Sequence, residues 1–111
     1  MQYLTIEVPV WMWQRVDGCT DNSMAIDAVD AITETLLVGA CVRDAGWRAA
    51  AAYQGEHDQF GWPPRAYPLP VTLRRSHWEW VLSQLKRWEP YESDGVLPEV
   101  RRCISAAIEP A

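Results

Sequence analysis

The amino-acid sequence predicts an α+β fold with a small, mainly antiparallel sheet of about three strands packed against about four helices. Residues 3–10 alternate between apolar and polar side chains, as a half-buried strand does. Several later segments repeat apolar residues at the three- and four-residue spacing of a helix. Glycine-, proline- and aspartate-containing turns separate these segments.

After the strand at residues 3–10, the first half of the chain is expected to be helical. Pro9 suits the first turn of a short helix over residues 10–16, and the polar sequence DGCTDNS at 17–23 is expected to end it. Helical spacing resumes at Ser23. The apolar stripe of this second helix consists of Ala25, Ala28, Val29, Ile32 and Leu36.

The middle of the chain is expected to change from helix to strand and then to an irregular connector. Gly39 is expected to interrupt the helical pattern and Gly46 to end it. Residues 47–54 are expected to form a second strand, with helix as the alternative because of their alanines. Residues 55–68 are rich in proline and glycine and predict a long irregular connector.

The second half of the chain predicts one strand and two helices. The strand covers residues 69–73, and Ser76 and Glu79 have the spacing of a capping box that opens the next helix. The apolar stripe of that helix is Trp78, Val81, Leu82, Leu85 and Trp88. A final helix is expected to begin at Pro98.

The two halves resemble each other within what we expect to be a single compact domain, residues 1–111. In each half, a strand precedes a helix with a Trp-x-Trp motif, WMW at 11–13 and WEW at 78–80. A second helix that contains a cysteine follows in each case. The sequence therefore predicts two pseudo-repeats, over residues 3–46 and 69–109.

The second Trp-x-Trp motif places one tryptophan away from the core. Residues i and i+2 of a helix point about 200° apart, so a buried Trp78 leaves Trp80 on the opposite side. Either the connector covers Trp80 with Phe60, Trp62 and Tyr67, or Trp80 is an anchor for a partner. The residues predicted to bind a protein partner or a second copy of the chain are Trp80, Arg87, Gln84, Trp11, Arg15 and Trp62.

The segment from Asp17 to Glu34 is strongly acidic. Asp27, Asp30 and Glu34 have the spacing of one helical face, which we interpret as a solvated acidic face. The segment lacks the full ligand series of a calcium-binding loop, so we assign no metal site and no cofactor, and a divalent-cation site on these carboxylates is kept as an alternative. A surface that binds a basic partner protein is an alternative interpretation.

Composition argues against several classes of function. The formal net charge is −5 without any arginine or lysine cluster, which disfavours nucleic-acid binding. No apolar run approaches the roughly 20 residues that span a bilayer, and the N-terminus does not resemble a leader. The three widely spaced cysteines are typical of reduced thiols. We therefore expect a cytoplasmic protein without a membrane partner.

Three segments resemble known sequences: VDGCTDNSMAIDAVD at 16–30, VRDAGW at 42–47 and VTLRRSHWEWVLSQLKRW at 71–88. In these segments the chain resembles small proteins of actinobacteria and actinobacteriophages, a group with no established activity. The resemblance implies an accessory factor of a host cell, phage or mobile element that acts by binding one cellular target.

The leading hypothesis is a small, acidic, cytoplasmic protein-interaction or regulatory module that binds a host protein or forms a homodimer. One alternative is a module that binds a small ligand or carbohydrate through the aromatic-rich connector. Another is a small enzyme with acid–base chemistry at His57 and Asp58. The sequence contains no catalytic motif, so no catalytic residue is assigned and an enzyme is the least favoured class.

Overall fold

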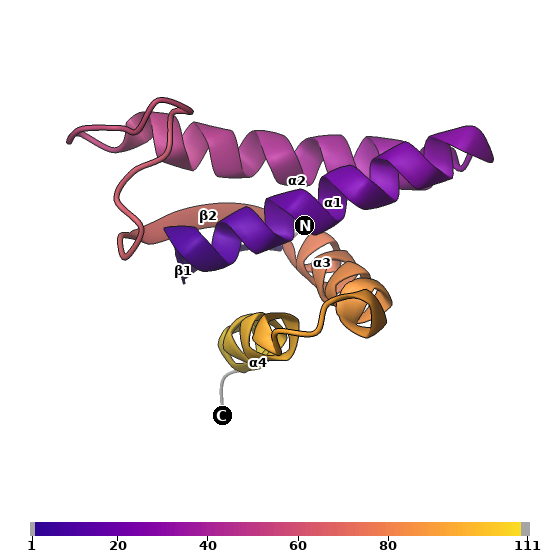
Figure 1. Ribbon diagram of the computed structural model, residues 1–111. Helices are drawn as coiled ribbons and strands as arrows, with labels where there is room; N and C mark the ends of the chain where they lie inside the picture. The colour runs from indigo at the N-terminus through magenta and orange to yellow at the C-terminus, as the bar shows by residue number, and fades with distance from the viewer. Residues whose placement is uncertain (1, 110–111) are drawn as a thin grey trace.

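The computed structural model describes residues 2–109, which form four α-helices, one short 3-10 turn and one two-stranded sheet (Figure 1). The elements in chain order are β1 (Tyr3–Pro9), α1 (Val10–Val29), α2 (Thr33–Ala52), β2 (Pro68–Arg74), α3 (Arg75–Trp88), η1 (Glu89–Tyr91) and α4 (Val96–Ile108). The predicted α+β class is confirmed, whereas the sheet has two strands instead of about three.

The two strands pair antiparallel in a register centred on Ile6 and Val71. Alternate side chains of both strands enter the core: Ile6, Val8, Leu69, Val71 and Leu73. On the opposite, exposed face, the hydroxyl groups of Thr5 and Thr72 are hydrogen-bonded at 2.7 Å. A two-stranded sheet alone is marginally stable in water, so this sheet depends on the helices that pack against its apolar face.

The second strand predicted at residues 47–54 is wrong. Helix α2 continues through Ala52, and an irregular connector then leads to β2. Alanine is the strongest helix former, and Ala50 is fully buried in the core. Local propensity and packing therefore both favour helix over strand in this segment.

Helix α1 runs without a break through residues 17–23, where the sequence predicts a turn. Its buried residues recur at steps of three and four and form a seam, which consists of Trp13, Val16, Thr20, Ser23 and Asp27. The seam packs against the antiparallel helix α2 at Trp13 and Thr20, and its last two residues, Ser23 and Asp27, hydrogen-bond to α3. The packing outweighs the cost of Gly18, which is about 1 kcal/mol in a helix interior.

Gly39 and Gly46 lie inside α2 and do not interrupt or end it. A Cβ atom on Gly46 would clash with the indole of Trp13, and one on Gly39 would lie 2.7 Å from the side chain of Met24. Both glycines therefore allow α1 and α2 to approach each other closely. The sequence pattern that predicts helix breaks marks a tight helix–helix contact instead.

Helix α3 buries the predicted stripe through Trp78, Val81 and Leu85. The predicted capping box does not form, because the helix begins at Arg75 and no side chain caps it. Glu79 instead forms an ion pair with Arg75 at 3.4 Å. The indole N–H of Trp78 donates a hydrogen bond to the carbonyl of Leu4 at 3.0 Å, which ties α3 to β1.

Trp13 and Trp78 meet in the core. Each is the fourth residue of a helix that follows its strand directly, and each is fully buried. Their rings pack edge to face, with centroids 6.1 Å apart and planes at 79°. Position in the fold thus matches Trp13 with Trp78, whereas aligning WMW with WEW would match Trp11 with Trp78.

Candidate functional site: the tip of the α1–α2 hairpin

Helices α1 and α2 form an antiparallel hairpin whose closed end projects beyond the other helices (Figure 1). Residues 25–37 at this end are termed the tip. The amide of Ile32 donates to the carbonyl of Asp27 at 3.0 Å and that of Ala31 to Ala28 at 3.2 Å, which is the Schellman pattern of helix ends. Ala31 has a φ of 56°, a left-handed conformation that usually belongs to glycine.

Large apolar side chains gather on the surface of the tip. Of the seven exposed large hydrophobic side chains in the described part of the chain, four lie here. They are Ile26 (48% exposed), Val29 (85%), Ile32 (45%) and Leu37 (69%). The sequence predicts a buried stripe through Val29 and Ile32, which is wrong because the chain turns after Val29 and the end of the hairpin extends past α3.

The tip also contains a buried carboxylate, that of Asp27. Asp27 accepts hydrogen bonds from both terminal nitrogens of Arg87, each at 2.9 Å, and from the Thr35 hydroxyl at 2.7 Å. These bonds, first those from Arg87 and then that from Thr35, hold the pKa of the Asp27 carboxyl below its usual value. The same pairing raises the pKa of Arg87.

A second set of polar contacts continues the network toward the body of the molecule. The Ser23 hydroxyl donates to Oε1 of Gln84 at 2.6 Å and accepts from Nε1 of Trp88 at 2.8 Å. Together with the Asp27 contacts, these bonds join the distal half of α1 to α2 and α3. Hydrogen bonds with fixed geometry, and not apolar packing alone, therefore hold the tip in place.

The acidic face predicted from Asp27, Asp30 and Glu34 does not exist as one helix face. Asp27 is 6% exposed and paired, whereas Asp30 and Glu34 are exposed. The physical reason is the turn after Val29, which places Asp30 at the end of α1 and Glu34 in the first turn of α2.

The predicted partner-binding residues of α3 are engaged within the molecule. Gln84 and Arg87 hydrogen-bond to α1, and Trp80 is half-buried and packs against the core. The connector's rings pack elsewhere: Trp62 stacks on Trp47 with centroids 4.1 Å apart, Tyr67 packs on Tyr53, and Phe60 is exposed. Trp80 forms no ring pair with them within residues 2–109.

The remaining predicted partner-binding residues, on α1, are also engaged within the molecule. Trp11 is half-buried, with the guanidinium of Arg65 5.5 Å from its ring centroid. Arg15 forms ion pairs with Glu92 at 3.0 Å and Asp94 at 2.7 Å, and the hydrogen bond to Asp94 raises its pKa. The six predicted residues are thus distributed over different contacts and are not gathered in one surface.

The residues considered for catalysis have structural partners. His57 Nε2 lies 2.7 Å from the carbonyl of Ala50, and one carboxylate oxygen of Asp58 accepts hydrogen bonds from the amides of Phe60 and Trp62. Cys19 is not among these residues, and burial raises the pKa of its thiol to about 12, which keeps it protonated and unreactive at neutral pH.

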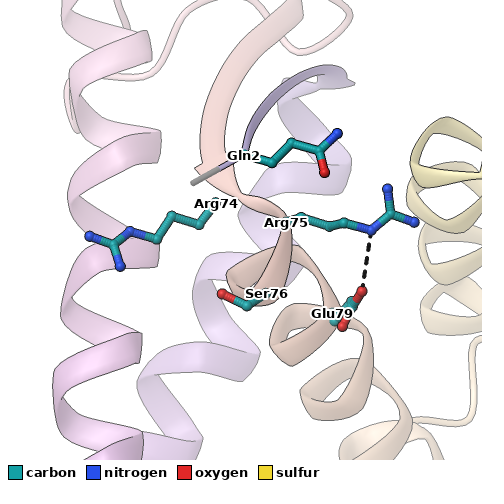
Figure 2. A pocket seen from close by; sticks show the side chains of 5 residues that line it. All are labelled: Gln2, Arg74, Arg75, Ser76 and Glu79. Atoms are coloured by element: carbon teal, nitrogen blue, oxygen red, sulfur yellow. Dashed lines mark ion pairs between the residues drawn. The ribbon is translucent and has the colours of Figure 1, made fainter.

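A shallow pocket lies beside the start of α3, and Figure 2 shows its lining residues Gln2, Arg74, Arg75, Ser76 and Glu79. The two arginines point to opposite sides: Arg75 pairs with Glu79, and Arg74 lies 6.0 Å from the ring centroid of Tyr3. Burial, followed by the charge of Arg74, lowers the pKa of the neighbouring His77. The pocket therefore lacks convergent groups that would hold an anion.

Within residues 2–109, no three histidine, cysteine or carboxylate side chains are grouped in a way that would hold a metal ion. No helix in the same range has both the length and the apolar character needed to cross a bilayer. Comparisons of the chain with protein-family models, curated proteins and solved structures find no match.

Proposed function

We propose that this protein is a small, acidic protein-interaction module whose contact surface is the tip of the α1–α2 hairpin. The observation that carries the proposal is the concentration of exposed Ile26, Val29, Ile32 and Leu37 at one projecting end. Scattered apolar residues are normal on protein surfaces, whereas a contiguous group of them is typical of binding sites.

The construction of the tip supports the same conclusion. The Asp27–Arg87 contacts fix its position without covering its apolar side chains. A surface that is already ordered loses less conformational entropy when it binds. The strained backbone of Ala31 lies in the same turn, and such strain is concentrated at functional sites.

In keeping with its resemblance to proteins of actinobacteria and their phages, we propose that the module is a cytoplasmic accessory factor that binds a host protein. Binding of a carbohydrate or small ligand by the connector is less favoured. Trp62 already packs on Trp47 of α2 and Tyr67 on Tyr53 at its end, so Phe60 is the one large hydrophobic ring of the connector that is exposed in the described chain.

Site-specific photo-crosslinking in cells that produce the protein tests this proposal. A photo-reactive amino acid replaces Val29 at the tip or, as a control, the exposed Ser93 in the loop between η1 and α4. We expect a discrete protein adduct from position 29 that is absent from position 93 and is lost when Leu37→Ser is added. Equal adducts from both positions, or an adduct only with a second copy of the chain, would contradict the proposal.

A further inference from the structure

We infer that the partner of the tip presents an apolar stripe bordered by lysine or arginine side chains. This inference rests on the proposed function and adds to it the chemistry of the partner. Two observations carry it: the exposed apolar side chains described above, and the unpaired negative charge around them.

The charge on the α1–α2 hairpin has one sign over a long stretch. Residues 16–42 contain five carboxylates and no arginine, lysine or histidine. Arg43 pairs with Asp17 and Asp21, each at 3.0 Å, and Arg87 from α3 pairs with Asp27. The other two carboxylates of the tip, Asp30 and Glu34, form no ion pair within the described residues.

These two unpaired carboxylates border the apolar surface. Asp30 follows Val29 directly, and Glu34 lies one turn before Leu37. Asp30 also lies at the C-terminal end of α1, where the helix dipole is already negative and disfavours a carboxylate. A cationic side chain of a partner would remove this unfavourable interaction and pair with Glu34 at the same time.

Charge complementarity also argues against other occupants of the tip. Two tips brought together would place Asp30 and Glu34 of each copy near those of the other, and like charges at an interface are costly. An anionic membrane surface or a nucleic acid would be repelled for the same reason. The tip therefore fits a basic amphipathic protein segment.

Three synthetic helical peptides serve as probes. The first has a leucine stripe flanked by lysines, the second the same stripe flanked by glutamates, and the third lysines around a serine stripe. Each is titrated into the isotope-labelled full chain and followed by NMR chemical shifts. We expect the lysine-flanked leucine peptide to bind residues 25–37 about tenfold more tightly than the others, and more weakly as NaCl rises from about 50 to about 500 mM.

Charge variants test whether Asp30 and Glu34 are the carboxylates that attract the lysine-flanked peptide. Asp30→Lys with Glu34→Lys is expected to weaken binding of the lysine-flanked leucine peptide about tenfold, and Asp30→Asn with Glu34→Gln by an intermediate factor. Glu56→Lys with Glu99→Lys makes the same change in net charge at exposed positions outside the tip and is expected to change affinity less than about twofold. Circular dichroism confirms that each variant is folded.

Different failures have different meanings. The inference on partner chemistry is overturned if lysine and glutamate flanks bind equally, if no peptide binds, or if the control pair weakens binding as much as the tip pair. In those cases crosslinking at position 29 still decides the proposed function on its own. If the free protein forms dimers through residues 25–37, both the inference and the proposed function are overturned.

Discussion

Gly46 occupies a position in α2 where a larger side chain has no room, because its Cα faces the indole ring of Trp13. Gly18 is the contrasting case, since a Cβ placed on it meets nothing within 4 Å. Both residues lie in helix interiors, where glycine is normally unfavourable. Only at Gly46 does close packing account for the glycine.

Alanine substitutions at these two glycines are expected to change stability in opposite directions. Gly46→Ala should lower the free energy of unfolding by about 1–3 kcal/mol, because the added methyl group overpacks the core. Gly18→Ala should raise it by about 0.5–1 kcal/mol, because alanine is the better helix former. Urea unfolding of both variants measures the difference, and a stabilising Gly46→Ala would contradict the tight contact with Trp13.

The paired carboxylate of Asp27 makes the stability of the folded protein depend on pH in the acidic range. Its pKa in the folded protein is lowered by Arg87 and Thr35, so the folded state binds fewer protons than the unfolded state in mild acid. The stabilisation is fully present above about pH 4, near the unfolded pKa, and is lost as pH falls through the folded pKa.

Asp27→Asn is therefore expected to reduce the dependence of stability on pH below about pH 4, while lowering stability at neutral pH. Asp30→Asn, at an exposed and unpaired position, is the matched control and should retain the dependence of the natural protein. Urea unfolding at a series of pH values gives the slopes. If stability changes with pH equally steeply in Asp27→Asn and in the natural protein, the Asp27–Arg87 pair contributes nothing to the pH dependence.

Different side chains of helix α3 have different structural roles. Trp78 enters the core, while Gln84 and Arg87 hydrogen-bond to α1 and Trp80 packs half-buried against the core. The expectation that Trp78 is buried is confirmed. The role of Trp80 as a partner anchor stays a prediction, and its packing against the core gives it a structural role as well.

Alanine variants separate these roles. Trp78→Ala should cost about 3–5 kcal/mol of unfolding free energy, because it leaves a cavity and removes the hydrogen bond to Leu4. Trp80→Ala should cost about 1–2 kcal/mol, because the ring is only half-buried. Urea unfolding measures both values. If Trp80→Ala leaves stability unchanged and removes the adduct at position 29, Trp80 acts as an anchor for the partner.

Local patterns predicted some elements well and failed at others for identifiable reasons. The two strands β1 and β2 and the apolar stripe of α3 follow from periodicity alone. The sequence wrongly predicts helix breaks in the segment 17–23, at Gly39 and at Gly46. Local signals do not reveal which residues a neighbouring helix buries. The exposed tip was likewise missed, because exposure there depends on where the hairpin turns.

At the scale of the whole molecule, stability should be uneven. The tip is exposed on an extension of the hairpin, and within residues 2–109 one ion pair, between Asp27 and Arg87, joins it to α3. Trp13, Trp78 and the buried sheet face lie in the continuous apolar core. Opening of the tip should therefore require less free energy than opening of the core.

Hydrogen exchange is expected to resolve this gradient. Amides at residues 28–36 should exchange faster than those of α1 near Trp13 and of α3 near Trp78, and Arg87→Met should accelerate exchange at the tip alone. Mass spectrometry of exchanged peptides provides the measurement. Uniform protection along α1 and α2 would contradict this picture, as would faster exchange of the core in Arg87→Met.

The antiparallel register of β1 and β2 relates the two strands by a local twofold axis, and the residue numbering of the helices that follow them can be compared on that basis. Under that relation Val10 corresponds to Arg75 and Trp13 to Trp78, and the last residue of α3, Trp88, corresponds to Ser23. Everything in α1 beyond Ser23 consequently has no counterpart in the shorter α3. The exposed apolar side chains begin within this additional length, so the proposed binding surface lies on the part of α1 that extends beyond the length of α3.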